Sequence, residues 1–390
     1  MTIPEPEDMV HVEKTDTLVD RAQYEMLKEL GFYEDSFMEG KVYNGHLVYL
    51  SIKRKDITSD FDFSKFPFLI EVEILANYQL EELPPSIRYL EHLRALTYKN
   101  FKNKKNFNPE ITLSKNVEYL DLTGNKFTDI PRIIRDPLRL KILHIGSNKL
   151  TSVPDWIFEC LNLEELWISN RYIRELPDQL GNLTKLKSFN IANCPISFLP
   201  ISFNKFTNLE IFYGGGTNIT EIPECIGNWK NLKIFRFFEN NVNYFPDFMG
   251  ELRELKEIYL TDNKIRKIPD SIGNIINLEK LHLAHNEITS ISEKIGHCSK
   301  LNEIQLYDNN LETLPDTIGN LENLQEFHVE ENQLTSLPDT LDGLKSLGLF
   351  NIANNHLQDL PRSIVDLARH CKIIMGKNPL PDVLYAMLDE

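Results

Sequence analysis

The sequence predicts an α/β solenoid, a horseshoe-shaped coil with a parallel β-sheet on its concave face and short helical, 3-10 or extended segments on its convex face. Three observations predict this fold class. Asparagine recurs every 23 residues, two apolar residues in alternating positions precede each asparagine, and proline follows six residues after it. A fixed period of this length is typical of chains built from stacked units that cannot bury a core alone.

The asparagine column defines the repeat. From residue 125 it advances to residue 378 in eleven equal steps of 23 residues, and nine of the twelve positions are Asn. The exceptions are Arg171, Cys194 and Thr217. A buried asparagine where a strand turns can bond the free backbone groups of adjacent turns. We therefore predict a structural asparagine ladder made of Asn125, Asn148, Asn240, Asn263, Asn286, Asn309, Asn332, Asn355 and Asn378.

Each unit predicts one strand and one return segment. Apolar residues lie five and three positions before the asparagine, as Leu120 and Leu122 do, which indicates a short strand with one buried face. Earlier in the unit apolar residues recur every three positions, as in Ile318, Leu321 and Leu324, which favours a tight helical or extended segment. Proline occupies its column in ten of eleven units and suits the start of that segment, because it fixes φ and lacks an N–H.

Three segments divide the chain. Residues 47–380 form the repeats, about 15 units, with looser spacing before residue 125. Residues 1–46 form an N-terminal capping segment, predicted to be a helix plus a hairpin, and residues 381–390 form a short C-terminal cap. No catalytic domain is expected after the last repeat, because about 12 residues are too few to fold as one.

The N-terminal segment carries helix and turn signals. Asp16 or Thr17 can cap a helix that ends at Gly31. Asn44–Gly45, between KVY and HLVYLSI, predicts a hairpin turn that leads into the first repeat strand. The apolar positions on one side of the predicted helix are Leu18, Ala22, Leu27 and Leu30.

Composition excludes several classes of protein. The formal charge of −16 argues against general nucleic-acid binding, and no apolar stretch is long enough to insert in a membrane. The hydrophobic fraction of 42% excludes a disordered chain. The five cysteines form no CxxC pair and no terminal cluster, which favours a reducing compartment, and the protein is expected to be cytoplasmic. Cys160 and Cys298 fall where neighbouring repeats place Leu, and they are interpreted as small buried apolar residues, not reactive thiols.

The residues carry a family resemblance. The stretch LPDTIGNLENLQEFHVEENQL at residues 314–334 fits the pattern LPxxIGNLxxLxxLxLxxNxL and resembles the leucine-rich repeat. The 23-residue spacing with LPxxI is most similar to intracellular Ras-group leucine-rich-repeat proteins, including Ras-binding scaffolds, and to cytosolic repeat proteins of prokaryotes. The resemblance covers more than four fifths of the chain. It implies the fold strongly and the function weakly, because this repeat serves many partners.

The strand residues that flank the buried pair are expected to point to the concave face. Trp, Tyr and Arg, which dominate binding energy at interfaces, are frequent there. The competing interpretation is that the rings pack on one another and merely cover the sheet. The predicted partner-binding residues are His144, Trp167, Tyr213, Arg236, Phe238, Tyr259, His282, Tyr307 and His328.

Charge is unevenly placed along the predicted face. Lysine and arginine gather in the first turns, whereas acidic residues line the later strands and their exits, which would steer a partner with a basic surface. The acidic residues are Glu239, Glu257, Asp262, Glu303, Asp308, Glu326, Glu330 and Glu331. The four lysines of KNFKNKKNF at residues 99–107 are interpreted as part of a solvated loop, with Lys102 to Lys105 as the fallback binding surface.

One region breaks the repeat rule. Arg171, Cys194 and Thr217 replace asparagine in three successive turns, and Gly214 to Gly216 bring glycine to a buried strand position. We expect a less filled, bent region there. Two interpretations stay open, a tolerated drift of the repeat and a hinge or ligand notch.

Catalytic and metal chemistry are not indicated. His282 and His285 come close to ligand spacing, but no cysteine or full ligand set accompanies them, so no metal and no cofactor are predicted. No phosphate-binding glycine loop, nucleophile elbow or HExxH motif occurs.

The sequence therefore predicts a non-enzymatic interaction module or scaffold that binds a protein or peptide on its concave face. The resemblance implies a first alternative, an adaptor for a small Ras-like GTPase in signal transduction. An alternative of another class is the substrate-recognition part of an enzyme complex such as a ubiquitin ligase. The sequence does not identify the partner.

Overall fold

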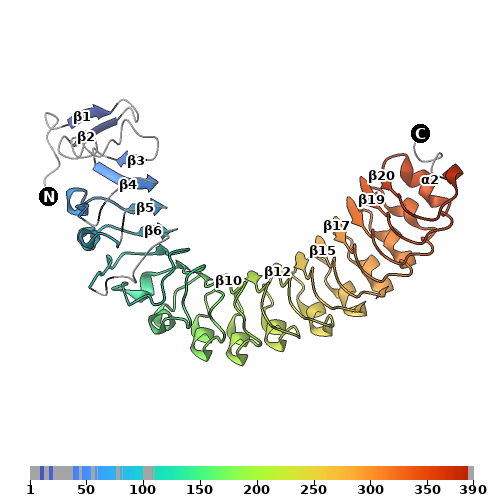
Figure 1. Ribbon diagram of the computed structural model, residues 1–390, viewed down its shortest axis with the longest axis horizontal. Helices are drawn as coiled ribbons and strands as arrows, with labels where there is room; N and C mark the ends of the chain where they lie inside the picture. Colours follow the sequence, from blue (N-terminus) through green and yellow to red (C-terminus); the bar gives the residue numbers. More distant parts are fainter. Residues whose placement is uncertain are drawn as a thin grey trace. The chain divides into compact units, whose positions relative to one another are not determined.

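The computed structural model describes residues 9–12, 17–20, 38–43, 46–53, 58, 60–75, 80, 82–99, 108 and 110–384. The chain divides into two compact units, Met1–Leu186 and Lys187–Glu390, called here the first and the second unit. Each is a solenoid in which short strands stack side by side, while 3-10 helices form the opposite side of the coil (Figure 1). The predicted parallel-sheet solenoid is confirmed.

In the first unit two antiparallel pairs precede the parallel strands. Strand β1 (Met9–Val12) pairs with β2 (Thr17–Asp20), and β3 (Met38–Tyr43) pairs with β4 (His46–Lys53). Parallel strands then follow from β4 to β9. They are β5 (Glu71–Leu75), β6 (Ala95–Lys99), β7 (Tyr119–Asp121), β8 (Ile142–His144) and β9 (Glu165–Trp167). The 3-10 helices are η2 (Phe63–Lys65), η3 (Pro85–Tyr89), η4 (Pro137–Arg139), η5 (Asp155–Glu159) and η6 (Asp178–Asn182).

The second unit is more regular. Its main sheet contains β10 (Ser188–Asn190), β11 (Ile211–Tyr213), β12 (Ile234–Arg236), β13 (Glu257–Tyr259), β15 (Lys280–His282), β17 (Glu303–Gln305), β18 (Glu326–His328), β19 (Leu349–Asn351) and β20 (Lys372–Ile374). A second small sheet pairs β14 (Lys267–Ile268) with β16 (Ser290–Ile291). The helices are η7 (Ile201–Lys205), η8 (Glu224–Asn228), η9 (Asp247–Glu251), η10 (Asp270–Asn274), η11 (Glu293–His297), η12 (Asp316–Asn320), η13 (Leu341–Gly343) and α2 (Ser363–Ala368).

The repeat period sets the strand register. Phe212 lies opposite Phe235, and Ile258 opposite Leu281, each one period of 23 residues further along the chain. Every turn therefore buries the same column against its neighbours, and these residues are less than 1% exposed.

Proline starts most of the 3-10 helices. In the second unit Pro223 precedes η8 and Pro315 precedes η12, with φ near −66° in both. The one unit without this proline has Ser292, whose hydroxyl oxygen accepts a hydrogen bond from the Lys294 N–H at 3.0 Å. A side-chain cap thus replaces the fixed φ of proline at this turn.

Each ladder asparagine joins two successive turns. The Asn263 side chain donates to the carbonyl oxygens of Phe237 at 3.0 Å and Leu260 at 3.1 Å, and its Oδ1 accepts from the Val242 N–H at 3.0 Å. The same pattern recurs at Asn286, and each asparagine is buried. Each one therefore satisfies backbone groups that the strand ends would leave unpaired.

The three turns in which another residue replaces the ladder asparagine differ from this pattern and from one another. Thr217 donates from its N–H and its hydroxyl to Oδ1 of Asn240, at 3.0 and 2.5 Å. The Cys194 side chain is fully buried. Arg171 is exposed, and the buried residue of this turn is Asn170, whose Nδ2 has no hydrogen-bond partner among the described residues.

The prediction of a less filled region around Gly214 is wrong. A Cβ atom on Gly214 would lie 2.7 Å from the rings of both Phe212 and Phe237, so these two side chains already occupy the space. Gly216 has a φ of +67°, a conformation that glycine adopts without strain. The glycines therefore accommodate large aromatic neighbours in a filled core.

The N-terminal helix prediction is wrong for residues 17–20. They form strand β2, paired with β1, so Leu18 lies opposite His11 and not on a helix. The rest of the predicted helix lies outside the described residues, as do Asn44–Gly45 and Lys102 to Lys105. Strands β3 and β4, on either side of residues 44 and 45, pair antiparallel.

The five cysteines are free and buried. Burial raises the pKa of Cys160, Cys225 and Cys298 to about 12. Their thiols are therefore protonated near neutral pH and poorly nucleophilic. In the part of the chain that the structure describes, no helix is both long and apolar enough to cross a membrane.

Candidate functional site

The final residues of successive strands form a column on the sheet surface of the second unit. Tyr213, Arg236, Tyr259 and His282 end β11, β12, β13 and β15, and the strand register places each beside the next. All four side chains are partly exposed. The period-2 alternation of the strands explains this placement, because the residues before them are buried.

These four side chains stack on one another, and we call them the ring column. The Arg236 guanidinium lies over the rings of Tyr213 and Tyr259, at 5.4 and 4.6 Å from their centroids. The His282 ring meets Tyr259 edge-on, with 4.6 Å between centroids. Cation–π contacts on both sides hold Arg236 in place. The rings therefore do pack on one another, but Arg236 keeps 38% of its side-chain surface exposed.

Carboxylates frame the ring column. The Tyr259 hydroxyl donates to Glu257 at 2.9 Å, and an Arg236 nitrogen lies 3.9 Å from the same carboxylate. On the next strand Glu303 forms an ion pair with Lys280 at 3.0 Å and lies 2.9 Å from Nε2 of His282. The surface thus combines flat ring faces with acidic groups.

The pKa shifts follow from this packing. Burial lowers the pKa of His282, although the nearby Glu303 carboxylate acts in the opposite direction. Burial opposes ionisation of Glu303 as well, but the hydrogen bond from Lys280 and the charge of His282 lower its pKa. Burial and the Glu257 hydrogen bond raise the pKa of Tyr259. Near neutral pH the Tyr259 phenol is therefore neutral, and the Glu303 carboxylate is charged.

The remaining candidates of the second unit form separate contacts. A Cβ atom on Gly215 would lie 2.9 Å from the Phe238 ring, so this ring covers bare backbone. Tyr307 meets His285 edge-on at 4.9 Å, and His285 lies 2.7 Å from Asp308. His328 lies between two carboxylates, 3.6 Å from Glu326 and 3.7 Å from Glu330, and the Glu330 hydrogen bond is the main cause that raises its pKa.

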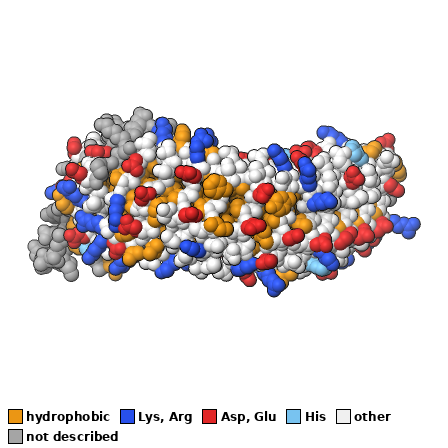
Figure 2. Space-filling model, turned by 90° about the horizontal axis from the view of Figure 1, so that it is seen from below, with side chains coloured by type: hydrophobic (Ala, Val, Ile, Leu, Met, Phe, Trp, Pro, Cys, Tyr) orange, Lys and Arg blue, Asp and Glu red, His pale blue; other side chains and the backbone are white. Residues whose placement is uncertain are grey.

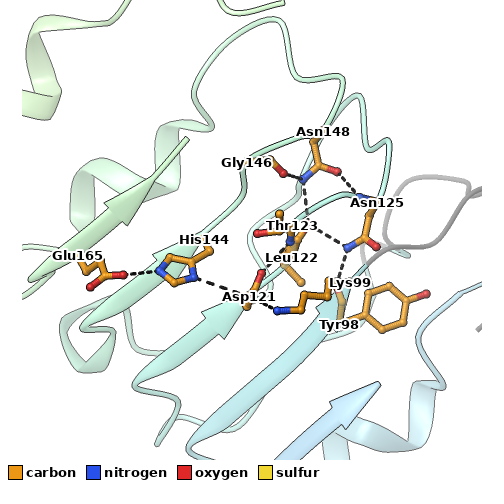
Figure 3. Close-up of polar contacts among 10 residues, drawn as sticks. All are labelled: Tyr98, Lys99, Asp121, Leu122, Thr123, Asn125, His144, Gly146, Asn148 and Glu165. Atoms are coloured by element: carbon orange, nitrogen blue, oxygen red, sulfur yellow. Dashed lines mark hydrogen bonds and ion pairs between the residues drawn. The ribbon is translucent and has the colours of Figure 1, made fainter. Parts of the chain in front are cut away.

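His144, the first of the two candidates of the first unit, belongs to a polar chain that crosses four strands (Figure 3). His144 stacks on Trp167 with 4.2 Å between centroids, and Nε2 of His144 lies 2.6 Å from Glu165. Its Nδ1 lies 3.9 Å from Asp121, which pairs with Lys99 at 3.1 Å. His144 is only 9% exposed, less than the sequence suggests.

Sequence reasoning missed Asp121 as a member of this chain. The carboxyl is almost fully buried; burial opposes its ionisation, but the nearby His144 ring and hydrogen bonds from Thr123 hold its pKa well below the usual range. Asp121 lies four residues before Asn125, in the same column as His144. Extending that column by one turn would have found it.

Two exposed apolar residues were also missed. Ile201 and Phe198 are 71% and 62% exposed in the second unit, and Ile201 opens η7. Figure 2 shows the side of the molecule on which the 3-10 helices lie, with apolar side chains exposed among charged ones. Phe198 precedes η7 and Ile201 is its first residue, and the repeat pattern predicts nothing about contacts at these two positions.

The basic residues predicted in the first turns are only partly described by the structure. Arg54, Lys55 and the Lys53 side chain lie outside the described residues, so the predicted separation of charge stays a prediction. Among the residues that the structure describes, no group of three His, Cys, Asp or Glu side chains could hold a metal ion.

The stacked strands, the asparagine ladder and the side-chain column define a leucine-rich-repeat solenoid. Residues 213–329 match the model of a leucine-rich repeat region. A comparison with curated proteins found no sequence match.

Solved structures share the fold. A leucine-rich-repeat protein of Leptospira interrogans is 27% identical with a TM-score of 0.76, covering 83% of this chain and 82% of its own. The plant peptide hormone receptor RGFR1, solved in complex with RGF2, is 24% identical with a TM-score of 0.70, covering 89% of this chain and 61% of its own. An internalin of Listeria monocytogenes is 18% identical with a TM-score of 0.59, covering 89% of both chains. Leucine-rich repeats are in general protein–protein interaction modules.

Proposed function

We propose that the chain is a non-enzymatic interaction module that binds a protein or peptide on the sheet surface of its second unit. The observation that carries this proposal is the ring column, in which Tyr213, Arg236 and Tyr259 are stacked, partly exposed and held in one arrangement. Tyr and Arg are enriched at the centres of protein interfaces, Tyr because its ring gives a large contact area with few rotatable bonds, and Arg236 is held here by its two tyrosine neighbours.

The side chains around the ring column favour a partner that carries both basic and apolar side chains. Glu257 and Glu303 lie beside the rings, and Glu330 lies at His328, further along the same sheet. A partner with lysine or arginine side chains would meet acidic groups while its apolar side chains contact the rings. One structural neighbour, the plant receptor, was solved with a peptide hormone, which supports a peptide as one form of partner.

A narrower version of the proposal names a small Ras-like GTPase as the partner and signal transduction in the cytoplasm as the setting. The 23-residue LPxxI repeat motivates the partner, and five buried free thiols fit a reducing compartment. A pull-down that compares the GTP-bound and GDP-bound states of candidate GTPases tests it. Equal capture in both states would count against the adaptor role.

The general proposal is tested by affinity purification followed by mass spectrometry. The baits are the wild-type chain, a Tyr213→Ala/Tyr259→Ala variant and a Tyr244→Ala control. Tyr244 is 44% exposed and lies outside the strands, so it matches the chemistry of the change without touching the sheet surface. A partner that wild type and control retain and the double variant loses supports the proposal. Partners retained equally by all three would place binding elsewhere.

A further inference from the structure

The side of the solenoid from which the chain enters each strand has a regular construction. Asparagine side chains there donate to a carbonyl oxygen of the previous turn, as Asn162 does to Leu138 at 2.7 Å and Asn277 to Arg253 at 2.8 Å. Two residues later, charged side chains pair between turns, as Lys256 does with Glu279 at 2.9 Å. Hydrogen bonds and ion pairs thus close this side of most turns.

In the first turns, histidine and phenylalanine rings take the place of these asparagine hydrogen bonds. The backbone bonds Ile70 N–H to Val48 and Arg94 N–H to Ile70 place Val48, Ile70 and Arg94 in the column that elsewhere carries the charged pairs. Two residues before each of them stand His46, Phe68 and His92. His46 stacks on Phe68 with 3.9 Å between centroids, and Phe68 lies nearly parallel to His92 at 6.1 Å.

These substitutions leave a cavity of about 390 Å³, within the usual range for small-molecule sites. Its lining includes Tyr43, Val48, Phe68, Ile70, His92 and Arg94. Ile70 is 41% exposed, whereas most of the regular turns place a charged or amide side chain in the same column. An apolar floor on an otherwise polar side of the molecule is what an aromatic or aliphatic ligand requires.

Two polar groups at this cavity lack partners. The exposed Arg94 guanidinium makes no hydrogen bond or ion pair with any described residue, and the nearby Glu118 carboxylate, whose pKa it helps to lower, is already bonded to Lys141 at 2.7 Å. The Nδ1 atom of His46 is buried without a hydrogen-bond partner among the described residues. A buried polar atom without a partner is costly, so a ligand that supplies one would be favoured. A guanidinium at the mouth of an apolar cavity selects an anion, and a carboxylate suits its planar fork.

We propose that this cavity binds an aromatic ring that carries a carboxylate. The ring lies against Phe68, Val48 and Ile70, and the carboxylate is bound by Arg94. Such a group is found in free aromatic acids and at the end of a peptide whose last residue is phenylalanine. The site lies in the first unit and is independent of the ring column of the second unit.

The test is a ligand-observed NMR titration of the full chain with 3-phenylpropanoate. A ligand of this size is expected to bind with a Kd on the order of millimolar. Its uncharged amide, 3-phenylpropanamide, should bind about tenfold more weakly or not at all, because it cannot form the charged pair. Two short peptides ending in phenylalanine, with a free and an amidated carboxyl terminus, distinguish the sources. Tighter binding of the free-carboxylate peptide points to a chain end, and tighter binding of 3-phenylpropanoate points to a small acid.

Variants locate the binding. Arg94→Gln should weaken binding of 3-phenylpropanoate about tenfold, and Arg94→Lys should restore part of it. Phe68→Leu should weaken the acid and its amide alike, because it removes a ring surface from both. Lys256→Gln, in the same column of the second unit, is the matched control and should bind as wild type does. No saturable binding by wild type, or equal binding by wild type and Arg94→Gln, would overturn the proposal, provided that the melting temperatures of the variants match.

Discussion

Replacing Asn309 by alanine tests how the asparagine ladder stabilises the second unit. Its Oδ1 accepts from the Ile288 N–H at 2.9 Å, and its Nδ2 donates to the carbonyl oxygens of Leu283 at 2.9 Å and Leu306 at 3.1 Å. After truncation the buried Ile288 N–H has no acceptor, at a cost of about 1 to 3 kcal/mol. The two carbonyl oxygens each lose one bond, worth about 0.5 to 1 kcal/mol.

Those carbonyl oxygens do not become unpaired, because the ladder bonds them twice. Leu283 also accepts from Asn286 at 3.0 Å, and Leu306 also accepts from Asn332 at 2.9 Å. We therefore expect a total loss of about 2 to 5 kcal/mol in the free energy of unfolding, and the largest single part of it comes from one amide. Urea denaturation followed by circular dichroism measures it. Asn310→Ala, at the exposed neighbouring asparagine, is the control and should stay within about 0.5 kcal/mol of wild type.

Because two ladder asparagines donate to the same carbonyl oxygen, a double variant gives a stricter test. In the Asn286→Ala/Asn309→Ala variant the Leu283 carbonyl oxygen loses both side-chain donors, so the double loss should exceed the sum of the single losses by about 1 kcal/mol or more. Asn286→Ala/Asn355→Ala, which share no carbonyl, should be additive within about 0.5 kcal/mol. A loss below about 1 kcal/mol for Asn309→Ala, or additivity in both pairs, would refute the ladder as the source of stability.

Further predictions concern the core and the sheet surface. Leu306→Ala, which truncates a side chain only 1% exposed, should cost about 2 to 5 kcal/mol by urea denaturation, and a loss below about 1 kcal/mol would contradict its core position. Tyr213→Ala/Tyr259→Ala should keep its melting temperature within a few degrees yet bind its partner at least about tenfold more weakly by calorimetry; unfolding instead would make the rings packing elements. Association with a basic partner should slow as salt rises through the physiological range, and an unchanged on-rate in stopped-flow mixing would exclude electrostatic steering. The pKa of His328 is raised in the folded protein, so this residue contributes stability that is present below its unfolded pKa and lost as pH rises through its folded pKa. The pKa of His282 is lowered, so this residue contributes stability that is present above its unfolded pKa and lost as pH falls through its folded pKa. Urea midpoints of His328→Gln and His282→Gln between about pH 5 and 8 should therefore differ from wild type with opposite slopes, and parallel curves would contradict both assignments.

The repeat fold could be predicted from the sequence because the repeat period determines the strand register, the place of the asparagines and the start of most 3-10 helices together. The spacing of 23 residues sets the strand register, so Phe212 had to lie opposite Phe235. The chemistry of asparagine, one acceptor and two donors on a short side chain, suited it to three backbone groups where the strand turns. Proline similarly marked where most of the 3-10 helices begin.

Features that depend on several side chains at once could not be predicted from the sequence. The space beside Gly214 looked empty because the sequence does not show that Phe212 and Phe237 converge there. Residues 17–20 satisfied helix-capping rules, but pairing with β1 outweighed that local preference. The buried asparagine of one turn is Asn170 and not the residue at position 171, because local geometry shifted by one residue while the period stayed intact.

The ring column unites two interpretations that the sequence left as alternatives. If the rings only covered the sheet, Arg236 would not keep 38% of its side-chain surface exposed between them. If they were free side chains, a partner would have to immobilise each one, at about 0.5 to 1.5 kcal/mol for a side chain with many rotamers. Stacking on Tyr213 and Tyr259 restricts Arg236 before any partner arrives, so part of that entropy is already lost on folding. The same contacts that protect the sheet therefore prepare it for binding, and replacing Tyr213 by phenylalanine should preserve both roles because the ring, not the hydroxyl, holds the guanidinium.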